Sequence, residues 1–185
     1  MSTEANIAPS RPSWLSRLTR KRRDRDALLP FYQAVVDAGR DPFWYRDGMV
    51  PDSVDGRFNM IAAIISIILV RMEAFEGEDA KHASVMLTEL FIDDMDESLR
   101  QIGIGDYVVG KHVGRMMGAL GGRLTAFRQA ALDRDYLTPV RRNVYHEAPA
   151  SEDAALLVAE RLDRFETRLR DVPLAGLVDG KLPPL

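Results

Sequence analysis

Four acidic side chains at helical spacing are the first residues in this sequence that could do chemistry. Asp93, Asp94 and Asp96 lie beside Glu97 in the segment DDMDE. Carboxylates one, three or four positions apart on a helix can share a divalent cation, because Mg²⁺ prefers oxygen ligands. A cation held in this way would in turn bind a diphosphate.

The cluster is similar to the Asp-rich helical motif of all-α prenyl synthases. An enzyme of that class needs a second acidic cluster facing the first, for which Asp163 and Glu166 are the helical candidates, with Arg164 and Arg168 interleaved. A solvated acidic face or a partner-binding surface explains the same residues. A Mg²⁺-dependent prenyl-diphosphate enzyme or prenyl-ligand binder using Asp93, Asp94 and Asp96 is therefore kept as an alternative.

Other chemical motifs fail on their details. The segment from Gly105 to Lys111 reads GxxxxGK, but His112 stands where a phosphate-binding loop needs Ser or Thr, and an acidic helix precedes it instead of a strand. The three histidines lie far apart, and no Ser, Thr or Cys sits in a nucleophile motif. The sequence predicts no catalytic residue, no metal site and no cofactor, and hence a protein that is not an enzyme.

The elements that carry these side chains are expected to pack around an uncharged run of thirteen residues, from Phe58 to Val70. Only Asn59 and Ser66 interrupt it, so a helix here would be apolar on every side and has to be surrounded. At about 1.5 Å per residue it is too short to cross the roughly 30 Å hydrocarbon layer of a bilayer. We expect the central helix of a globular domain, with Asp52 as its N-cap and Asp55 in its first turn.

Further helices are predicted from apolar spacing over residues 25–38, 80–101, 107–133 and 151–170, the last capped by Ser151, with loops at 41–52 and 134–149. The predicted fold is a single all-α domain, residues 25–185, of five to six helices around the buried central apolar helix. Gly114, Gly118, Gly121 and Gly122 weaken the helix over 107–133. Either close helix approach or a deformable binding surface would explain them.

Residues 1–24 are expected to form a mobile basic N-terminal arm. Residues 1–26 carry seven basic and three acidic side chains, a net charge of +4, so the rest of the chain is near −7. Such an arm suits anionic lipid or ribosomal RNA, although a solvated tail has the same composition. The residues that would make these contacts are Trp14, Arg17, Arg20, Lys21, Arg22 and Arg23. Zero cysteines and the lack of a secretion signal favour a cytoplasmic location.

Several phrases of the sequence resemble one family in their order along the chain: VPDSVDGRF, DDMDESLRQIGIGD and VGK. They are similar to the ubiquinol-cytochrome c chaperone family, over about residues 28–175. The resemblance implies an assembly chaperone that binds newly synthesised cytochrome b for respiratory complex III. It further implies a ribosome contact, a small partner protein, no binding to DNA, and peripheral attachment to the cytoplasmic face of the inner membrane as one option.

Four groups of residues are the expected contact surfaces for a client or partner. They are the aromatic loop Phe43, Trp44 and Tyr45; Asp55 with Arg57; Asp93, Asp94 and Asp96; and Tyr107, Lys111, Met116 and Met117. A plain structural role stays open for each, since the aromatic side chains could pack inward and Asp55–Arg57 or Asp94–Lys111 could be ion pairs. Flexible methionines suit an adaptable apolar surface. A ribosome- or RNA-binding module without a chaperone role is the remaining alternative.

Overall fold

The computed structural model of the 185-residue chain describes residues 14–101, 106–146 and 149–185, and the side chains of 23–98, 100–101, 114–146 and 149–185 among them. These ranges contain eight helices and no strand: α1 Trp14–Gly39, α2 Pro42–Arg46, α3 Val54–Glu73, α4 Glu78–Gln101, α5 Asp106–Asp133, α6 Leu137–Asn143, α7 Glu152–Leu169 and α8 Leu174–Val178. The prediction of a single all-α domain is confirmed. Five to six helices was too low a count because α2, α6 and α8 are short.

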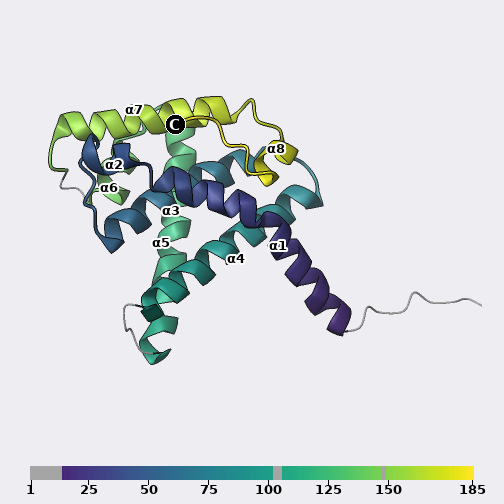
Figure 1. Ribbon diagram of the computed structural model, residues 1–185. Coiled ribbons are helices and arrows are strands. Elements are labelled where there is room, and N and C mark those ends of the chain that lie inside the picture. Colours follow the sequence, from purple (N-terminus) through teal and green to yellow (C-terminus); the bar gives the residue numbers. More distant parts are fainter. Residues whose placement is uncertain (1–13, 102–105, 147–148) are drawn as a thin grey trace, which may run out of the picture.

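Helix α3 lies among the other long helices (Figure 1). Every residue from Asn59 to Leu69 is buried, and α3 contacts α1, α4, α5 and α7. Apolar residues all round a helix give it no face to present to water, so neighbours on several sides are what this sequence requires. The uncharged run is thus buried against four of the other helices.

The start of α3 differs from the prediction. Its N-cap is Ser53, whose hydroxyl oxygen accepts a hydrogen bond from the Gly56 amide at 3.1 Å. Asp52, the predicted cap, instead accepts from the Arg57 guanidinium at 2.7 Å. Asp55 lies in the first turn, as expected. Both Ser and Asp are good caps, and the prediction chose the wrong one of two adjacent residues.

Helix α1 begins at Trp14 and continues past residue 24, where the sequence predicted the boundary between the arm and the domain. Its first half extends away from the other helices (Figure 1). Its second half packs on α3 and α4. On α4, Leu87, Leu90 and Phe91 are buried. Val85 of the same helix is 56% exposed.

Residues 134–149 hold the helix α6, where the sequence predicted only a polar connection. Its buried Pro139 lies in the first turn, where the backbone N–H has no partner within the helix. Tyr136, Val140 and Tyr145 are buried in the core around it. The segment is mostly polar in composition, and its few apolar residues are the ones that pack.

Helix α7 matches its prediction closely. Ser151 caps it, and the seam Val158, Leu162, Phe165 and Leu169 is fully buried. At its other end the Arg71 guanidinium donates to the carbonyl oxygens of Leu169, Arg170 and Val172 at 3.1, 3.0 and 3.2 Å. A cation at a helix C-terminus satisfies carbonyls that have no partner within the helix. None of the helices in the described ranges is long and apolar enough to span a membrane.

Candidate functional site

The acidic cluster of α4 is engaged by α1 and by α4 itself. Asp93 pairs with Arg25 and Asp96 with Arg100, the latter at 2.8 Å. The Tyr32 hydroxyl donates to Asp94 at 2.5 Å. Burial, followed by the hydrogen bond to Asp94, raises the pKa of Tyr32. Each of the three carboxylates therefore has a protein partner, and Asp93 and Asp94 link α4 to α1.

The acidic residues of α7 are likewise held by arginines. Asp163 and Glu166 pair with Arg134 at 2.6 and 2.9 Å, and Glu166 also accepts from Arg170 at 2.7 Å. In the described part of the chain no group of three His, Cys, Asp or Glu residues could hold a metal ion. The prenyl-diphosphate alternative needed free carboxylates on both helices, so the arrangement does not support it.

The aromatic residues of α2 divide between the core and the surface. Trp44 is fully buried, and its indole N–H donates to the Ala38 carbonyl at 2.7 Å. The Tyr45 hydroxyl donates to the Gly39 carbonyl at 2.8 Å, and the Phe43 ring lies 4.0 Å from the Arg161 guanidinium. Burial raises the pKa of Tyr45 to about 12. Trp44 is therefore a packing residue, whereas Phe43 and Tyr45 stay half-buried.

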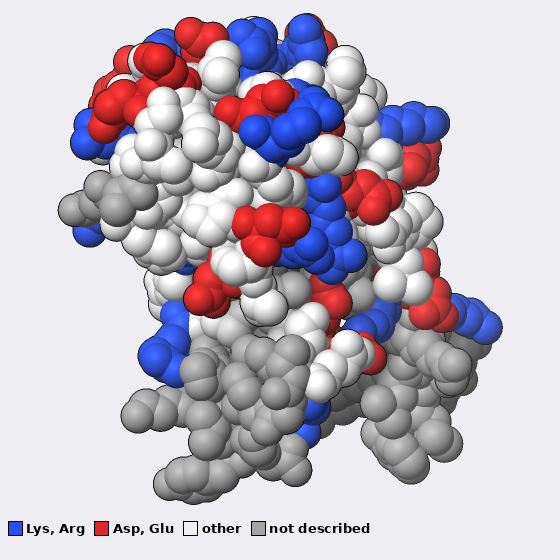
Figure 2. Space-filling view, turned by 60° about the vertical axis from the view of Figure 1, so that its left-hand side comes forward, with Lys and Arg blue, Asp and Glu red and all other residues white. Residues whose placement is uncertain are grey.

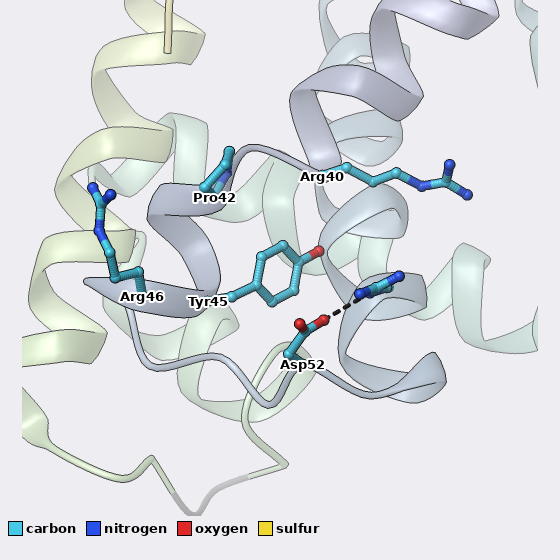
Figure 3. A pocket seen from close by; sticks show the side chains of 6 residues that line it. Arg40, Pro42, Tyr45, Arg46 and Asp52 are labelled. Carbon is cyan, nitrogen blue, oxygen red and sulfur yellow. Dashed lines mark hydrogen bonds and ion pairs between the residues drawn. The ribbon is translucent and has the colours of Figure 1, made fainter.

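A polar pocket of about 530 Å³ opens beside Tyr45, lined by Arg40, Pro42, Arg46, Asp52 and Arg57 as well (Figure 3). Arg40 and Arg46 extend to opposite sides of the Tyr45 ring. Arg57 and Arg46 are paired with Asp52 and Asp47, both at 2.7 Å. Arg57 thus pairs with Asp52, whereas the ion pair left open for it in the sequence was with Asp55. The arginines do not converge on one point, so the pocket is not a focused anion site.

An apolar groove runs between α4 and α5, with the end of α3 as its base. It measures about 390 Å³ and is lined by Leu69, Glu73, Ser84, Val85, Thr88, Glu89, Ile92, Met117 and Leu124. Two of its large apolar side chains are unusually open to solvent, Val85 at 56% and Met117 at 42%. Contiguous exposed apolar surface commonly marks a binding site. We call this surface the α4–α5 groove.

The groove continues into methionine-rich packing. Ile92 and Met117 also line a closed space of about 10 Å³, together with Phe91, Met95, Met116 and Leu120. Methionine side chains are unbranched and adapt to irregular shapes. Of the predicted contact residues, Met117 lines the groove and Met116 lines the adjoining space. The side chains of Tyr107 and Lys111, and with them the possible Asp94–Lys111 pair, lie outside the described residues.

The four glycines of α5 do not serve close helix packing. A Cβ added at Gly114, Gly118, Gly121 or Gly122 would meet no atom within 4 Å outside the helix's own nearby backbone. At Gly39, by contrast, a Cβ would lie 2.7 Å from the Ile61 side chain. The close-approach explanation for the α5 glycines is therefore wrong. Because glycine within a helix lowers its stability by about 0.5–1 kcal/mol relative to Ala, the deformable-surface explanation stays open for them.

Sequence reasoning missed a buried cation, Arg123. Only 6% of this residue is exposed, and its guanidinium donates to the Asn59 side-chain oxygen at 2.6 Å and to the Asn143 carbonyl at 3.3 Å. Burial lowers its pKa, and no carboxylate pairs with it in the described structure. The Asn59 amide nitrogen lies 3.0 Å from His146 Nε2. The signal was available: Asn59 interrupts an apolar run, and Arg123 falls on the Leu120–Phe127 stripe.

The basic residues predicted to touch lipid or RNA belong to the first half of α1. Arg23 is exposed, and the side chains of Trp14, Arg17, Arg20, Lys21 and Arg22 lie outside the described residues. On the face shown in Figure 2, blue and red side chains are interspersed over the described part of the molecule. No broad region of one charge is visible there.

Comparison with known proteins decides the family. The ubiquinol-cytochrome C chaperone family model matches residues 46–183, about three quarters of the sequence. The chain belongs to the ubiquinol-cytochrome c chaperone family. The crystal structure of the Cbp3 homolog from Brucella abortus has a TM-score of 0.77 to this chain at 25% sequence identity, covering 94% of this chain and 97% of the other. The comparison with curated proteins found no match.

The chaperone family model covers the α4–α5 groove in full. It begins at Arg46, so α1 and most of α2 lie before it, whereas the resemblance in the sequence was placed over about residues 28–175. The family identified from the sequence is confirmed. A chaperone family implies a client protein, and among the described surfaces the groove has the apolar character that an unassembled client would need.

Proposed function

We propose that the protein is a non-catalytic assembly chaperone that binds newly synthesised cytochrome b and supports assembly of ubiquinol-cytochrome c oxidoreductase, respiratory complex III. The observation that carries the proposal is the exposed, methionine-flanked α4–α5 groove within the region matched by the family model. A membrane protein that awaits its partners exposes apolar surface. A chaperone for it needs an apolar surface that adapts and then releases.

Loss of the gene tests this function directly. In cells that lack it, we expect assembled complex III and the level of cytochrome b both to fall, and a plasmid copy to restore them. Cytochrome c oxidase, measured in the same membranes, serves as the control for a general assembly defect. Normal complex III and normal cytochrome b in the deleted strain would overturn the proposal.

We further propose that the basic first half of α1 meets anionic lipid or ribosomal RNA, so that the protein works at the cytoplasmic face of the inner membrane. The support is its charge and its extension away from the helical body (Figure 1). Replacing Arg17, Arg20, Lys21, Arg22 and Arg23 by Ala should abolish salt-sensitive binding to vesicles of anionic lipid or to ribosomes, whichever binds the unchanged protein. Absence of binding to both by the unchanged protein would contradict this part. A small partner protein is also proposed, and co-purification with the tagged protein tests it.

A further inference from the structure

The polar pocket beside Tyr45 contains more hydrogen-bond donors than its own acidic residue uses. Its lining has three arginines, Arg40, Arg46 and Arg57, and one carboxylate, Asp52, which gives the lining a net charge of +2. Arg57 meets Asp52 through Nε alone, and both of its terminal nitrogens lack a hydrogen-bond partner in the described structure. The Arg40 side chain makes no hydrogen bond or ion pair among the described residues. The pocket therefore has donors left for further carboxylates.

The ion pairs at the pocket do not use up their arginines. The Arg57 side chain is 56% exposed and that of Arg46 is 75% exposed. Pairs as exposed as these contribute little stability, because water screens both charges. Arg46 binds Asp47 through Nε and Nη2, which leaves Nη1 without a partner in the part of the chain that the structure describes. Since a guanidinium carries five N–H donors, each arginine can bind a second carboxylate and keep the first.

The placement of the charges selects the kind of anion. Arg40 and Arg46 extend to opposite sides of the Tyr45 ring, so a single phosphate cannot meet both (Figure 3). Asp47 and Asp52 are paired with arginines of this pocket. A layer of lipid phosphates or an RNA backbone would bring negative charge against these aspartates as well as against the arginines. A protein segment can place two separate carboxylates at the arginines and uncharged residues between them.

Two apolar side chains are exposed in the segment between Arg46 and Arg57. Met49 is 47% exposed and Val54 is 58% exposed. Met49 also has a φ of 52°, a left-handed conformation that is uncommon for a residue other than glycine. Residues held in such conformations cluster at functional sites. Arg, Tyr and Met are enriched in protein interfaces, so the residues at and beside the pocket suit a protein partner.

From these observations we infer that the pocket beside Tyr45 binds an acidic segment of a partner protein through two carboxylates that are separated along that segment. Arginines on the two sides of the ring each bind one carboxylate, and Met49 and Val54 contact apolar residues of the same segment. The inference goes beyond the proposed function, because it concerns a surface other than the α4–α5 groove and does not depend on what that groove binds.

Synthetic peptides that differ only in the placement of two glutamates test this chemistry. In four peptides of the same composition the glutamates are adjacent, or separated by two, four or six uncharged residues, and a fifth peptide has glutamines in their place. Binding of each labelled peptide to the full chain is measured by fluorescence anisotropy at low ionic strength. We expect one of the separated pairs to bind at least about threefold more tightly than the adjacent pair or the glutamine peptide.

Variants place the binding in the pocket. Arg40→Gln and Arg57→Gln should each weaken binding of the best peptide at least about threefold. Arg164→Gln on α7 is the matched control, because its side chain is 54% exposed, close to Arg57 at 56%, pairs with Glu160 and lies outside the pocket. Asp52→Asn should strengthen binding, since it removes the one carboxylate of the lining. Circular dichroism checks that all variants are folded.

Three results would overturn the inference: no binding of any peptide at millimolar concentration, adjacent glutamates that bind as tightly as every separated pair, or equal weakening by Arg164→Gln and Arg40→Gln. Binding of the full chain to RNA or to vesicles of anionic lipid that is lost in Arg40→Gln would assign the pocket to phosphates and would also overturn it. The level of complex III in the deleted strain tests the proposed function alone, so the two can fail independently.

Discussion

Arg123 brings a positive charge into the core without a carboxylate partner in the described structure. Its strongest contact is the Asn59 oxygen at 2.6 Å, and the Phe58 ring lies 5.3 Å from its guanidinium carbon. A hydrogen bond to a charged group contributes about 1.5–3 kcal/mol, and a buried charge that loses its partner costs more. The Asn59–Arg123 contact is thus a buried polar link between α3 and α5.

Asn59→Leu should lower the free energy of unfolding by about 3 kcal/mol, because it leaves Arg123 buried with only a weak backbone contact. Arg123→Met should cost less, since it removes the charge together with its need for a partner. The double variant should lose less stability than the sum of the two single-variant losses, by at least about 1 kcal/mol. Urea denaturation followed by circular dichroism measures all three, and additive losses would contradict the coupling.

Buried tyrosines predict loss of stability in alkali. Burial raises the pKa of Tyr45 and Tyr145 to about 12 in the folded protein, and also raises the pKa of Tyr32 and Tyr136. The unfolded chain ionises near pH 10, so stability is complete below that pH and falls as the pH rises above it. Between about pH 10 and its folded pKa, ionisation of each tyrosine in the unfolded chain lowers the free energy of unfolding by about 1.4 kcal/mol per pH unit.

The free energy of unfolding obtained from denaturation curves should therefore be lower at about pH 11 than at about pH 8 by several kcal/mol. Tyr145→Phe should lessen this dependence, because one of the ionising groups is gone. Tyrosinate absorbance should appear together with the loss of helix, and its appearance in the folded protein below about pH 11 would contradict the prediction.

Residue-level chemistry was only partly accessible from the sequence. Asp93 and Asp94 are adjacent in the sequence, but their partners Arg25 and Tyr32 lie more than sixty positions away. Long-range pairing of this kind follows from how α1 crosses α4, which periodicity does not encode. For the same reason Asn59 was visible as a polar interruption while its partner Arg123 was not.

At the scale of single elements, variants of Ser53 and Asp52 test which of these adjacent residues is the N-cap of α3. Ser53→Ala removes the bond to the Gly56 amide and should cost about 1 kcal/mol. Asp52→Ala removes only an exposed ion pair and should stay within about 0.5 kcal/mol. Thermal unfolding of the two variants compares them. A larger loss for Asp52→Ala would restore the cap assignment made from the sequence.

Glycines on α3 and α5 should respond to alanine in opposite directions. Gly118→Ala fills open space in the interior of α5 and should stabilise the protein by about 0.5–1 kcal/mol. Gly56→Ala should destabilise it strongly, because the new Cβ would lie 1.8 Å from the Pro51 carbonyl oxygen. Urea denaturation measures both, and a loss of stability in Gly118→Ala would show that α5 packs more closely than described.

Long, strongly patterned elements were predictable, and short ones were not. The seam of α7 and the apolar run of α3 carry their burial in the spacing and composition of the residues. Helices α2, α6 and α8 have at most seven residues, too few to show a helical period. Their residues become helical because Trp44, Val140 and Leu177 insert into the core. Tertiary contacts therefore decide what local preference leaves open.

At the scale of the whole molecule, the sequence predicted the buried core but did not predict the α4–α5 groove. An all-α domain around residues 58–70 follows from one run that no solvent-facing helix could carry. The groove does not follow from any such rule, because the sequence does not show that the apolar residue Val85 is 56% exposed.

The open space around the α5 glycines has a consequence for the order in which parts of the protein loosen. Amide hydrogens between Gly114 and Gly122 should exchange with solvent sooner than those of the neighbouring stretch that contains Arg123 and Phe127, since less packing opposes their opening. One side of the groove can then shift while the interior keeps its arrangement. A segment bound against this wall could then dissociate without unfolding of the whole protein.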